Sequence, residues 1–261
     1  MKIVLTIAGS DTSGGAGVQM DLRVLHACGV YGVSVVTALT AQNTQGVHRV
    51  HRVPPRFVAE QIDAVARDLP IAAAKLGMLD QARIVEIVAE RLHRRSIPNV
   101  VVDPVILAKD GTPLLNNRAI AVLKERVLPR ALVVTPNVPE AEALSGVSIT
   151  DTASIREAAL RMAGLGVKGV VVKGGHLPGE PVDTLFWANE FFEFSGPRLE
   201  GAPVHGTGCI YASALAAAVA KGATVPEACA RAREVVAGAI EGAAALGKGT
   251  RLALFGIAEE G

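Results

Sequence analysis

Two runs of consecutive valines most constrain the fold of this 261-residue chain. Val100–Val102 and Val170–Val172 are continuous apolar segments with no polar residue alternating along them. A strand that is apolar on both faces must be covered on both faces, which is the situation of strands in parallel sheets. Parallel strands need long crossover connections, usually helices. The sequence therefore predicts an α/β protein with a buried, mainly parallel central sheet.

Short β-rich segments alternate with amphipathic segments of helical length. The expected strands are Lys2–Ala8, Val33–Leu39, Ala72–Leu76, Asn99–Asp103, Leu132–Thr135 and Val167–Lys173. The expected helices are Gly15–Cys28, Pro55–Asp68, Gln81–Arg95, Asn117–Arg126, Pro139–Ser145, Thr152–Leu165, Thr207–Lys221 and Val225–Leu246. The segment Pro181–Pro203 breaks this rhythm, and its pattern predicts a hairpin of Asp183–Trp187 and Glu190–Phe194. We expect one three-layer α/β/α domain over residues 1–261.

The composition narrows the classes of partner. The formal net charge is +1, from 26 basic and 25 acidic residues, so neither nucleic acid nor an anionic membrane is expected as the main partner. The three cysteines are far apart and form no C-x-x-C motif, which argues against a disulfide framework and a zinc site. No apolar stretch approaches the ~20 residues of a membrane span, and no signal peptide is recognisable. We expect a soluble, cytoplasmic protein.

The segment His205-Gly206-Thr207-Gly208-Cys209 opens an expected helix of small residues. Its two glycines allow a tight turn and close approach to a ligand. The free N–H groups and positive dipole end of the helix predict an anion site, most naturally for phosphate. The same dipole would lower the pKa of the Cys209 thiol, which could then serve as a base or nucleophile. The alternative is an ordinary loop followed by a small buried cysteine.

Further polar or glycine-rich loops follow the other expected strands, where ligands bind in open α/β sheets. Gly9–Gly17 allows close backbone approach, but it matches neither a Walker A loop nor a dinucleotide fingerprint. Gln42 carries an amide that can both donate and accept toward a heterocycle. Met78 offers a soft wall for an aromatic ring, although a core methionine is the more common case.

Two carboxylates and a lysine complete the set. Asp103 ends an all-valine strand, and an unpaired buried charge there would be costly. Glu140 falls in the first turn of a helix, where the dipole favours it; together with Asp103 it could hold Mg²⁺ through water. Lys173 lies at a glycine turn and suits nucleotide phosphates. The combination indicates phosphoryl transfer from a magnesium nucleotide to a small hydroxyl compound.

Eight motifs, in order along nearly the whole chain, carry a family resemblance. They are Thr6–Gly17, Thr37–Thr44, Lys75–Leu79, Val102–Val105, Leu107–Gly111, Thr135–Glu140, Lys173–His176 and His205–Cys209. With them the chain resembles the hydroxymethylpyrimidine/phosphomethylpyrimidine kinases of thiamine biosynthesis, in the ribokinase-like superfamily. The resemblance implies a ribokinase-like fold. It also implies a kinase that uses ATP and Mg²⁺ on 4-amino-5-hydroxymethyl-2-methylpyrimidine and then on its monophosphate.

The resemblance also implies roles for particular residues. The substrate would lie near Ala16, Asp21, Gln42, Met78 and Val105, with Gln42 on the polar edge of the pyrimidine. Gly206, Thr207 and Gly208 would form the anion hole beside Cys209, which stands where many ribokinase relatives have Asp. Lys173, Asn137, Thr207 and Asp183 would contact the nucleotide, while Asp103 and Glu140 would order Mg²⁺ through water. The hairpin would lie near the adenine, and a homodimer is expected.

Two other functions remain open at this point. A pyridoxal kinase of the same branch would bind a similarly flat, methylated heterocycle with a hydroxymethyl arm. Gln42 and Met78 favour the aminopyrimidine over pyridoxal. A non-catalytic binder of pyrimidine or nucleotide would not need Cys209, Asp103 and Glu140, all of which are present.

Overall fold

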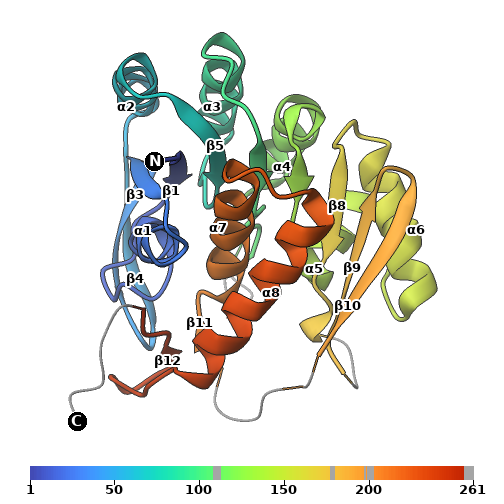
Figure 1. The fold of residues 1–261 in the computed structure, drawn as a ribbon. Helices are drawn as coiled ribbons and strands as arrows, with labels where there is room; N and C mark the ends of the chain where they lie inside the picture. Colours follow the sequence, from blue (N-terminus) through green and yellow to red (C-terminus); the bar gives the residue numbers. More distant parts are fainter. Residues whose placement is uncertain (108–112, 177–179, 197, 199–202, 256–261) are drawn as a thin grey trace.

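The computed structural model describes residues 1–107, 113–176, 180–196, 198 and 203–255. Its centre is an eight-stranded sheet (Figure 1). The strand order is β10 (Glu190–Ser195), β9 (Val182–Trp187), β8 (Gly169–Val172), β7 (Val133–Val134), β6 (Val100–Val102), β5 (Ile71–Leu76), β1 (Ile3–Ala8) and β2 (Tyr31–Val36). The pairs from β2 to β8 are parallel, and β9 and β10 each run antiparallel to the preceding strand. The predicted, mainly parallel sheet is confirmed.

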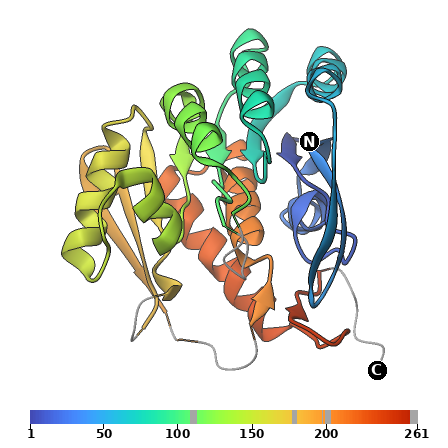
Figure 2. The same ribbon diagram turned by 180° about the vertical axis from the view of Figure 1, so that it is seen from behind.

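Helices cover both faces of the sheet, as Figures 1 and 2 show from opposite sides. One face is covered by α1 (Gly17–Ala27), α7 (Thr207–Ala220) and α8 (Val225–Glu241). The other is covered by α2 (Pro55–Asp68), α3 (Ala82–Arg94), α4 (Asn117–Val122), α5 (Val138–Ser145) and α6 (Thr152–Ala163). The predicted three layers are therefore present.

The valine strands are buried on both faces, as their sequence predicts. Val100 and Val102 belong to the core under α2–α6, whereas Val101 between them belongs to the core under α1, α7 and α8. All three side chains are at most 3% exposed. Alternate residues of one strand thus supply two separate hydrophobic cores.

The expected single strand Val33–Leu39 is wrong, because the chain leaves the central sheet at Thr37. The N–H of Thr37 still donates to the carbonyl of Ala8 on β1. Beyond it, β3 (Ala38–Asn43) pairs with β4 (Gly46–Arg52) in a separate antiparallel hairpin. All seven residues of β4 are exposed, so the segment lacks the buried apolar face by which strands are recognised in sequence.

Other differences concern element ends. The helix expected over Asn117–Arg126 gives way after Val122 to a π-helical turn, Leu123–Val127, and a 3₁₀ turn, Leu128–Arg130. The helix expected to reach Leu246 ends at Glu241. A 3₁₀ turn covers Gly174–His176, and a short parallel pair joins β11 (Val204–His205) to β12 (Arg251–Leu252).

The second hairpin is where the sequence predicts it. β9 and β10 pair from Val182 to Ser195 and turn at Ala188 and Asn189, which have φ values of 50° and 65°. Two successive positive φ values match the twist of a tight hairpin.

Among the described residues, no helix is both long and apolar enough to cross a bilayer.

Candidate active site

The turn that opens α7 lies against the first glycine-rich loop. Gly206 is the N-cap of α7 with a φ of 80°. A Cβ at this position would lie 1.9 Å from the carbonyl oxygen of Gly15, so the close approach of the two loops requires glycine. The N–H groups of the first turn of a helix have no intrahelical acceptor, and the helix dipole adds positive potential there. At Thr207 and Gly208 the molecule therefore offers the geometry of an anion site.

A lysine and an aspartate lie directly beside this turn. Lys173 Nζ is 3.1 Å from Asp103 Oδ1, in an ion pair whose lysine and aspartate side chains are 16% and 4% exposed. A Cβ on Gly208 would lie 3.2 Å from that Nζ and 3.4 Å from Asp103 Oδ2. Burial favours the neutral amine, but the Asp103 and Glu140 carboxylates outweigh it and raise the pKa of Lys173. A charged lysine thus adjoins the N-terminus of α7.

Glu140 is held at the start of α5 by a capping box. Its Oε2 accepts from the N–H of Asn137, and the Asn137 side chain accepts from the N–H of Glu140. Its Oε1 accepts from the N–H of Ile106, which follows the β6 strand end. Burial raises the pKa of Glu140, Lys173 opposes this shift and Asp103 reinforces it. Glu140 therefore fixes two strand-end loops as well as contributing a carboxylate.

The carboxylates at this site are too few to bind a hard cation such as Mg²⁺ by themselves, and phosphate or water would have to complete its coordination. Among the residues that the structure describes, no group of three or more His, Cys, Asp or Glu side chains is placed to bind a metal directly. Asp103 and Glu140 supply two carboxylates, and Mg²⁺ is commonly held by one or two carboxylates together with waters and substrate phosphates.

Cys209, in the first turn of α7, is a half-buried free thiol with charged groups nearby. Burial raises the pKa of Cys209 to about 11, and the nearby Lys75 ammonium only partly opposes this shift. Asp21 and Asp103 raise it further, while a hydrogen bond from the Gly17 backbone lowers it. The sequence left the balance between helix dipole and surroundings open. In the structure the surroundings prevail, and the thiol is protonated at neutral pH.

A buried ion pair lies behind Cys209. Lys75 Nζ is 2.8 and 2.9 Å from the two carboxylate oxygens of Asp21, and both side chains are fully buried. Thr6 and Ser213 donate their hydroxyl hydrogens to the same carboxylate. Burial disfavours the charged amine, but Asp21 and the other nearby groups raise the pKa of Lys75 above its ordinary value.

This network changes how Asp21 is understood. The sequence resemblance puts Asp21 beside the substrate, whereas the structure engages its carboxylate with four protein contacts and leaves it 0% exposed. Asp21 thus acts beneath the site, on Lys75. Sequence reasoning assigned Lys75 no role, although a lysine inside the apolar strand Ile71–Leu76 is itself a signal.

Asp183 is likewise engaged within the protein. Its Oδ1 accepts from the N–H of Gly174, and its Oδ2 lies 2.7 Å from Nη1 of Arg233 on α8. It therefore holds the turn that follows Lys173. Sequence reasoning missed Arg233, because a single arginine on an amphipathic helix gives no local signal of its partner.

The other side of the site is formed by the first loop and the β3–β4 hairpin. Ala16 is the N-cap of α1, and its Cα lies 3.3 Å from where a Gly206 Cβ would be. Met78 reaches back to the first loop, since a Cβ on Gly9 would lie 2.5 Å from its methyl carbon. Val105 has a φ of 40°, an unusual conformation for a β-branched residue that is often found at functional sites.

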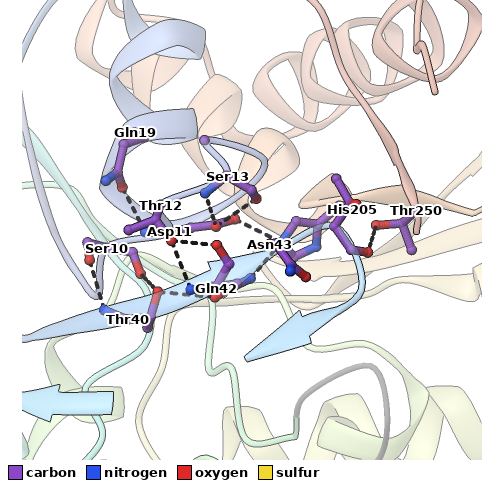
Figure 3. Close-up of polar contacts among 12 residues, drawn as sticks. Ser10, Asp11, Thr12, Ser13, Gln19, Thr40, Gln42, Asn43, His205 and Thr250 are labelled. Atoms are coloured by element: carbon purple, nitrogen blue, oxygen red, sulfur yellow. Dashed lines mark hydrogen bonds and ion pairs between the residues drawn. The ribbon is translucent and has the colours of Figure 1, made fainter. Parts of the chain in front are cut away.

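Gln42 projects from β3 into a dense set of polar contacts (Figure 3). Its amide lies 3.0 Å from His205 Nε2, immediately before the α7 turn. His205 Nε2 is also 2.9 Å from Asp11 Oδ2 in the first loop. Sequence reasoning proposed no role for Asp11 or His205. Residues 108–111 of the motif Leu107–Gly111 lie outside the described residues.

Known proteins resemble this chain over nearly its whole length. The family described as Phosphomethylpyrimidine kinase matches residues 11–253. A hydroxymethylpyrimidine/phosphomethylpyrimidine kinase of Haemophilus influenzae is 42% identical over 95% of this chain and 94% of its own length. A thiamine biosynthesis bifunctional protein of Geobacter sulfurreducens is 50% identical over 94% of this chain, which spans only 50% of that longer protein.

Solved structures agree with the fold. Phosphomethylpyrimidine kinase of Clostridium difficile superposes with a TM-score of 0.83 and 38% identity, covering 92% of this chain and 100% of that one. Pyridoxal kinase of Staphylococcus aureus in complex with ADP gives a TM-score of 0.91 and 32% identity, over 97% and 93% of the two chains. These neighbours confirm the expected ribokinase-like fold. The chain therefore belongs to the phosphomethylpyrimidine kinase family, a family of phosphotransferases.

Proposed function

We propose that this protein transfers the γ-phosphoryl group of ATP to 4-amino-5-hydroxymethyl-2-methylpyrimidine, and then phosphorylates the monophosphate to the diphosphate, in thiamine diphosphate biosynthesis. Family membership supports the reaction class. The observation that carries the proposal is the meeting of Lys173 and Asp103 with Gly208 at the start of α7. Positive charge and free N–H groups gather where a transferring phosphoryl group needs them.

Each group of site residues would contact a different part of the bound ATP and Mg²⁺. Gly206, Thr207 and Gly208 would receive the negative charge of the transferring group, and Lys173 would contact the ATP phosphates. Asn137, and the turn that Asp183 supports, would border the nucleotide, with the β9–β10 hairpin near the adenine. Asp103 and Glu140 would hold Mg²⁺ through water; when bound, the ion neutralises phosphate charge.

Cys209 would receive the proton of the attacking hydroxyl group. Because burial raises the pKa of its thiol, Cys209 must lose its own proton before it can act as a base. Lys75 lies close enough to stabilise the thiolate that results. Phosphoryl transfer demands little of a base, so a small thiolate population is compatible with this role.

The pyrimidine would occupy the side of the site lined by Ala16, Gln42, Met78 and Val105. The Gln42 amide would pair with the amino group and the adjacent ring nitrogen, since it offers both a donor and an acceptor. Met78 would pack on the ring face.

Pyridoxal phosphorylation is a second candidate activity. It is favoured by the TM-scores of 0.89 and 0.90 against the Staphylococcus aureus pyridoxal kinase bound to pyridoxal, alone or with AMP-PCP. These structures are 31% identical to this chain, compared with 42% for the Haemophilus influenzae kinase. The aminopyrimidine is therefore the preferred substrate of our proposal.

A single assay separates the candidates. ATP consumption is measured side by side with hydroxymethylpyrimidine, its monophosphate and pyridoxal, and a 5-methyl analogue that lacks the hydroxyl group controls for plain ATP hydrolysis. We expect the highest kcat/KM with the two pyrimidines. A higher kcat/KM with pyridoxal would establish the alternative, and ATP consumption no faster than with the analogue would exclude both.

We also propose that the protein is a homodimer in the cytoplasm. The β3–β4 hairpin exposes the apolar side chains of Leu39, Val47 and Val50 at 48%, 45% and 38%, and a second copy packed against the hairpin would cover them. The free thiols of Cys28, Cys209 and Cys229 suit a reducing compartment. Sedimentation should give twice the chain mass, and Val50→Glu should shift it toward the monomer.

A further inference from the structure

Asp11 and His205, to which the proposed reaction gives no role, form a contact chain with Gln42 (Figure 3). The chain joins the first glycine-rich loop, the residue before the α7 turn and the hairpin strand β3. Its donors and acceptors can be counted atom by atom, and the count decides which way the Gln42 amide faces.

Asp11 is fixed first. Its Oδ1 accepts from both the N–H and the hydroxyl of Ser13, at 2.8 and 2.7 Å. Its own N–H donates to the Gln19 side chain at 2.9 Å. Burial raises the pKa of Asp11, but its hydrogen bonds with His205 and Ser13 outweigh this and lower the pKa below its ordinary value. Asp11 is therefore a carboxylate at neutral pH, with Oδ2 left for His205.

His205 is fixed next. Its Nε2 is 2.9 Å from Asp11 Oδ2, and a carboxylate oxygen can only accept, so Nε2 must carry a hydrogen. The ring is also confined, since a Cβ on Gly15 would lie 2.6 Å from both His205 Cδ2 and Leu252 Cδ2. The tautomer and the position of the ring are thus set from outside Gln42.

The Gln42 amide then has one arrangement that satisfies its neighbours. The structure places the amide nitrogen of Gln42 3.0 Å from the protonated Nε2, where two donors would face each other. We therefore exchange the amide oxygen and nitrogen and assign the oxygen to this position, where it shares the Nε2 hydrogen with Asp11. The other amide position is 3.3 Å from Thr40 Oγ1, whose hydrogen goes to the Ser10 carbonyl at 3.0 Å. Thr40 Oγ1 is therefore free to accept from the amide nitrogen. The opposite arrangement would set two donors against each other at His205.

Only the amide is left to be oriented, because the backbone of Gln42 is already held. Its N–H donates to Thr12 Oγ1 at 2.8 Å, and its carbonyl accepts from the same hydroxyl at 2.5 Å. With the oxygen on His205 and the nitrogen on Thr40, one amide hydrogen and one oxygen lone pair remain. The free hydrogen can donate to a ring nitrogen, and the free lone pair can accept from an adjacent amino group. An edge with these two groups in exchanged positions would not match.

We propose that His205, held in its Nε2–H tautomer by Asp11, is a positioning residue that sets the direction of the Gln42 amide and thereby the preference for an aminopyrimidine edge. This inference rests on the proposed function for the identity of the substrate. The tautomer and the amide direction themselves follow from contacts within the protein.

The decisive variant is Asp11→Asn, which keeps the size of the side chain. Ser13 still needs an oxygen as acceptor, so the new NH₂ group faces His205 and draws it into the Nδ1–H tautomer. Nε2 then accepts, and the Gln42 amide reverses. We expect the KM of the aminopyrimidine to rise about tenfold to a hundredfold, as for a mispaired buried hydrogen bond, with kcat and the KM of ATP within a few-fold.

The double variant Asp11→Asn, Gln42→Leu tests whether Asp11 affects aminopyrimidine binding through the Gln42 amide. Gln42→Leu alone should weaken aminopyrimidine binding and leave ATP binding unchanged. Adding Asp11→Asn should then change the aminopyrimidine KM by no more than about twofold. Asp151→Asn, at the exposed N-cap of α6, removes the same charge away from the site and serves as the matched control.

Imidazole ¹⁵N chemical shifts test the tautomer without any substrate, with the signal assigned by its loss in His205→Phe. We expect Nε2–H in the parent protein and Nδ1–H in Asp11→Asn. A parent His205 in the Nδ1–H tautomer would overturn the inference, as would additive effects of Asp11→Asn and Gln42→Leu. A protein with the expected tautomers but no aminopyrimidine phosphorylation would instead refute the proposed function.

Discussion

At the scale of single residues, the surroundings of a group in the candidate site can shift its pKa against the direction that its sequence position suggests. Cys209 has the sequence position of an activated thiol, at a helix start. Burial nevertheless raises the pKa of Cys209 to about 11. The catalytic role proposed for Cys209 can therefore be tested through the pH dependence of the rate.

We expect Cys209→Ala to lose roughly 10²–10⁴-fold in kcat with both KM values nearly intact, the usual contribution of a general base. The pKa of Cys209 lies above neutrality, so its thiolate fraction grows as the pH rises. Parent kcat should accordingly rise between about pH 7 and 9, whereas Cys209→Asp, ionised throughout, should recover part of the rate without that rise. Turnover of Cys209→Ala within a few-fold of the parent would reduce Cys209 to a packing role.

Gly206→Ala tests the close approach of the two loops. A Cβ would meet the Gly15 carbonyl at 1.9 Å, so we expect loss of activity together with a lower urea midpoint. Gly222→Ala is the matched control, since Gly222 also has a positive φ, 96°, but nothing lies within 4 Å of its Cβ position. It should cost only about 1 kcal/mol of unfolding free energy and leave kcat unchanged. Equal effects of the two substitutions would contradict the role given to the contact.

Lys173→Ala should raise the KM of ATP much more than that of the pyrimidine, because it removes positive charge beside the proposed phosphate site. Glu140→Gln should raise the Mg²⁺ concentration needed for half-maximal rate. Lys168→Ala removes the same charge at an exposed lysine that makes no ion pair among the described residues, and it serves as the control for Lys173→Ala. ATP and Mg²⁺ titrations that overlay those of the parent would remove both residues from the nucleotide site.

At the scale of elements, ion pairs between strands and helices fix their relative positions more specifically than apolar packing does. The Lys75–Asp21 pair links β5 to α1, and the Ser213 hydroxyl adds α7 to the same carboxylate. Asp183 and Arg233 link β9 to α8. These ties fix the strand ends and the helix starts from which the site is built.

Lys75→Met should destabilise the fold by about 3–5 kcal/mol, because it leaves the Asp21 carboxylate buried without its partner. Since the pKa of Lys75 is raised above its ordinary 10.5, the contribution of the pair is fully present below that pH and is lost only above it. The decrease in unfolding free energy caused by Lys75→Met, measured by urea denaturation, should therefore be the same at pH 7 and pH 9. The double variant Lys75→Met, Asp21→Leu should regain part of the stability, and a single variant as stable as the parent would contradict the pairing.

At the scale of the whole molecule, ligand binding and folding are linked. Each ligand that binds only the folded state stabilises it by about 2.7 kcal/mol at 100 times its Kd. Differential scanning fluorimetry should show separate increases in Tm with ATP and with hydroxymethylpyrimidine. Pyridoxal at the same concentration should raise Tm less. A larger increase with pyridoxal would favour the second candidate activity.

The layers and most of the helices and strands could be predicted from the sequence alone. Continuous valine strands and regular amphipathic segments report burial locally, so the parallel sheet, its helices and the β9–β10 hairpin could be predicted from them. The glycine loops and the motif order also identified the family, which the comparisons confirm. The assignment of individual site residues remains a proposal.

The contacts between residues far apart in the sequence became apparent only in the folded structure. The hairpin strand β4 is wholly exposed and has no apolar pattern, so nothing local marks it as a strand. Asp21 is paired with Lys75, 54 positions along the chain, and His205 with Asp11, 194 positions away. The direction of the Gln42 amide and the protonation of Cys209 depend on such neighbours. Hydrogen bonding, charge and desolvation act through space, whereas sequence periodicity records only how each segment meets its own core.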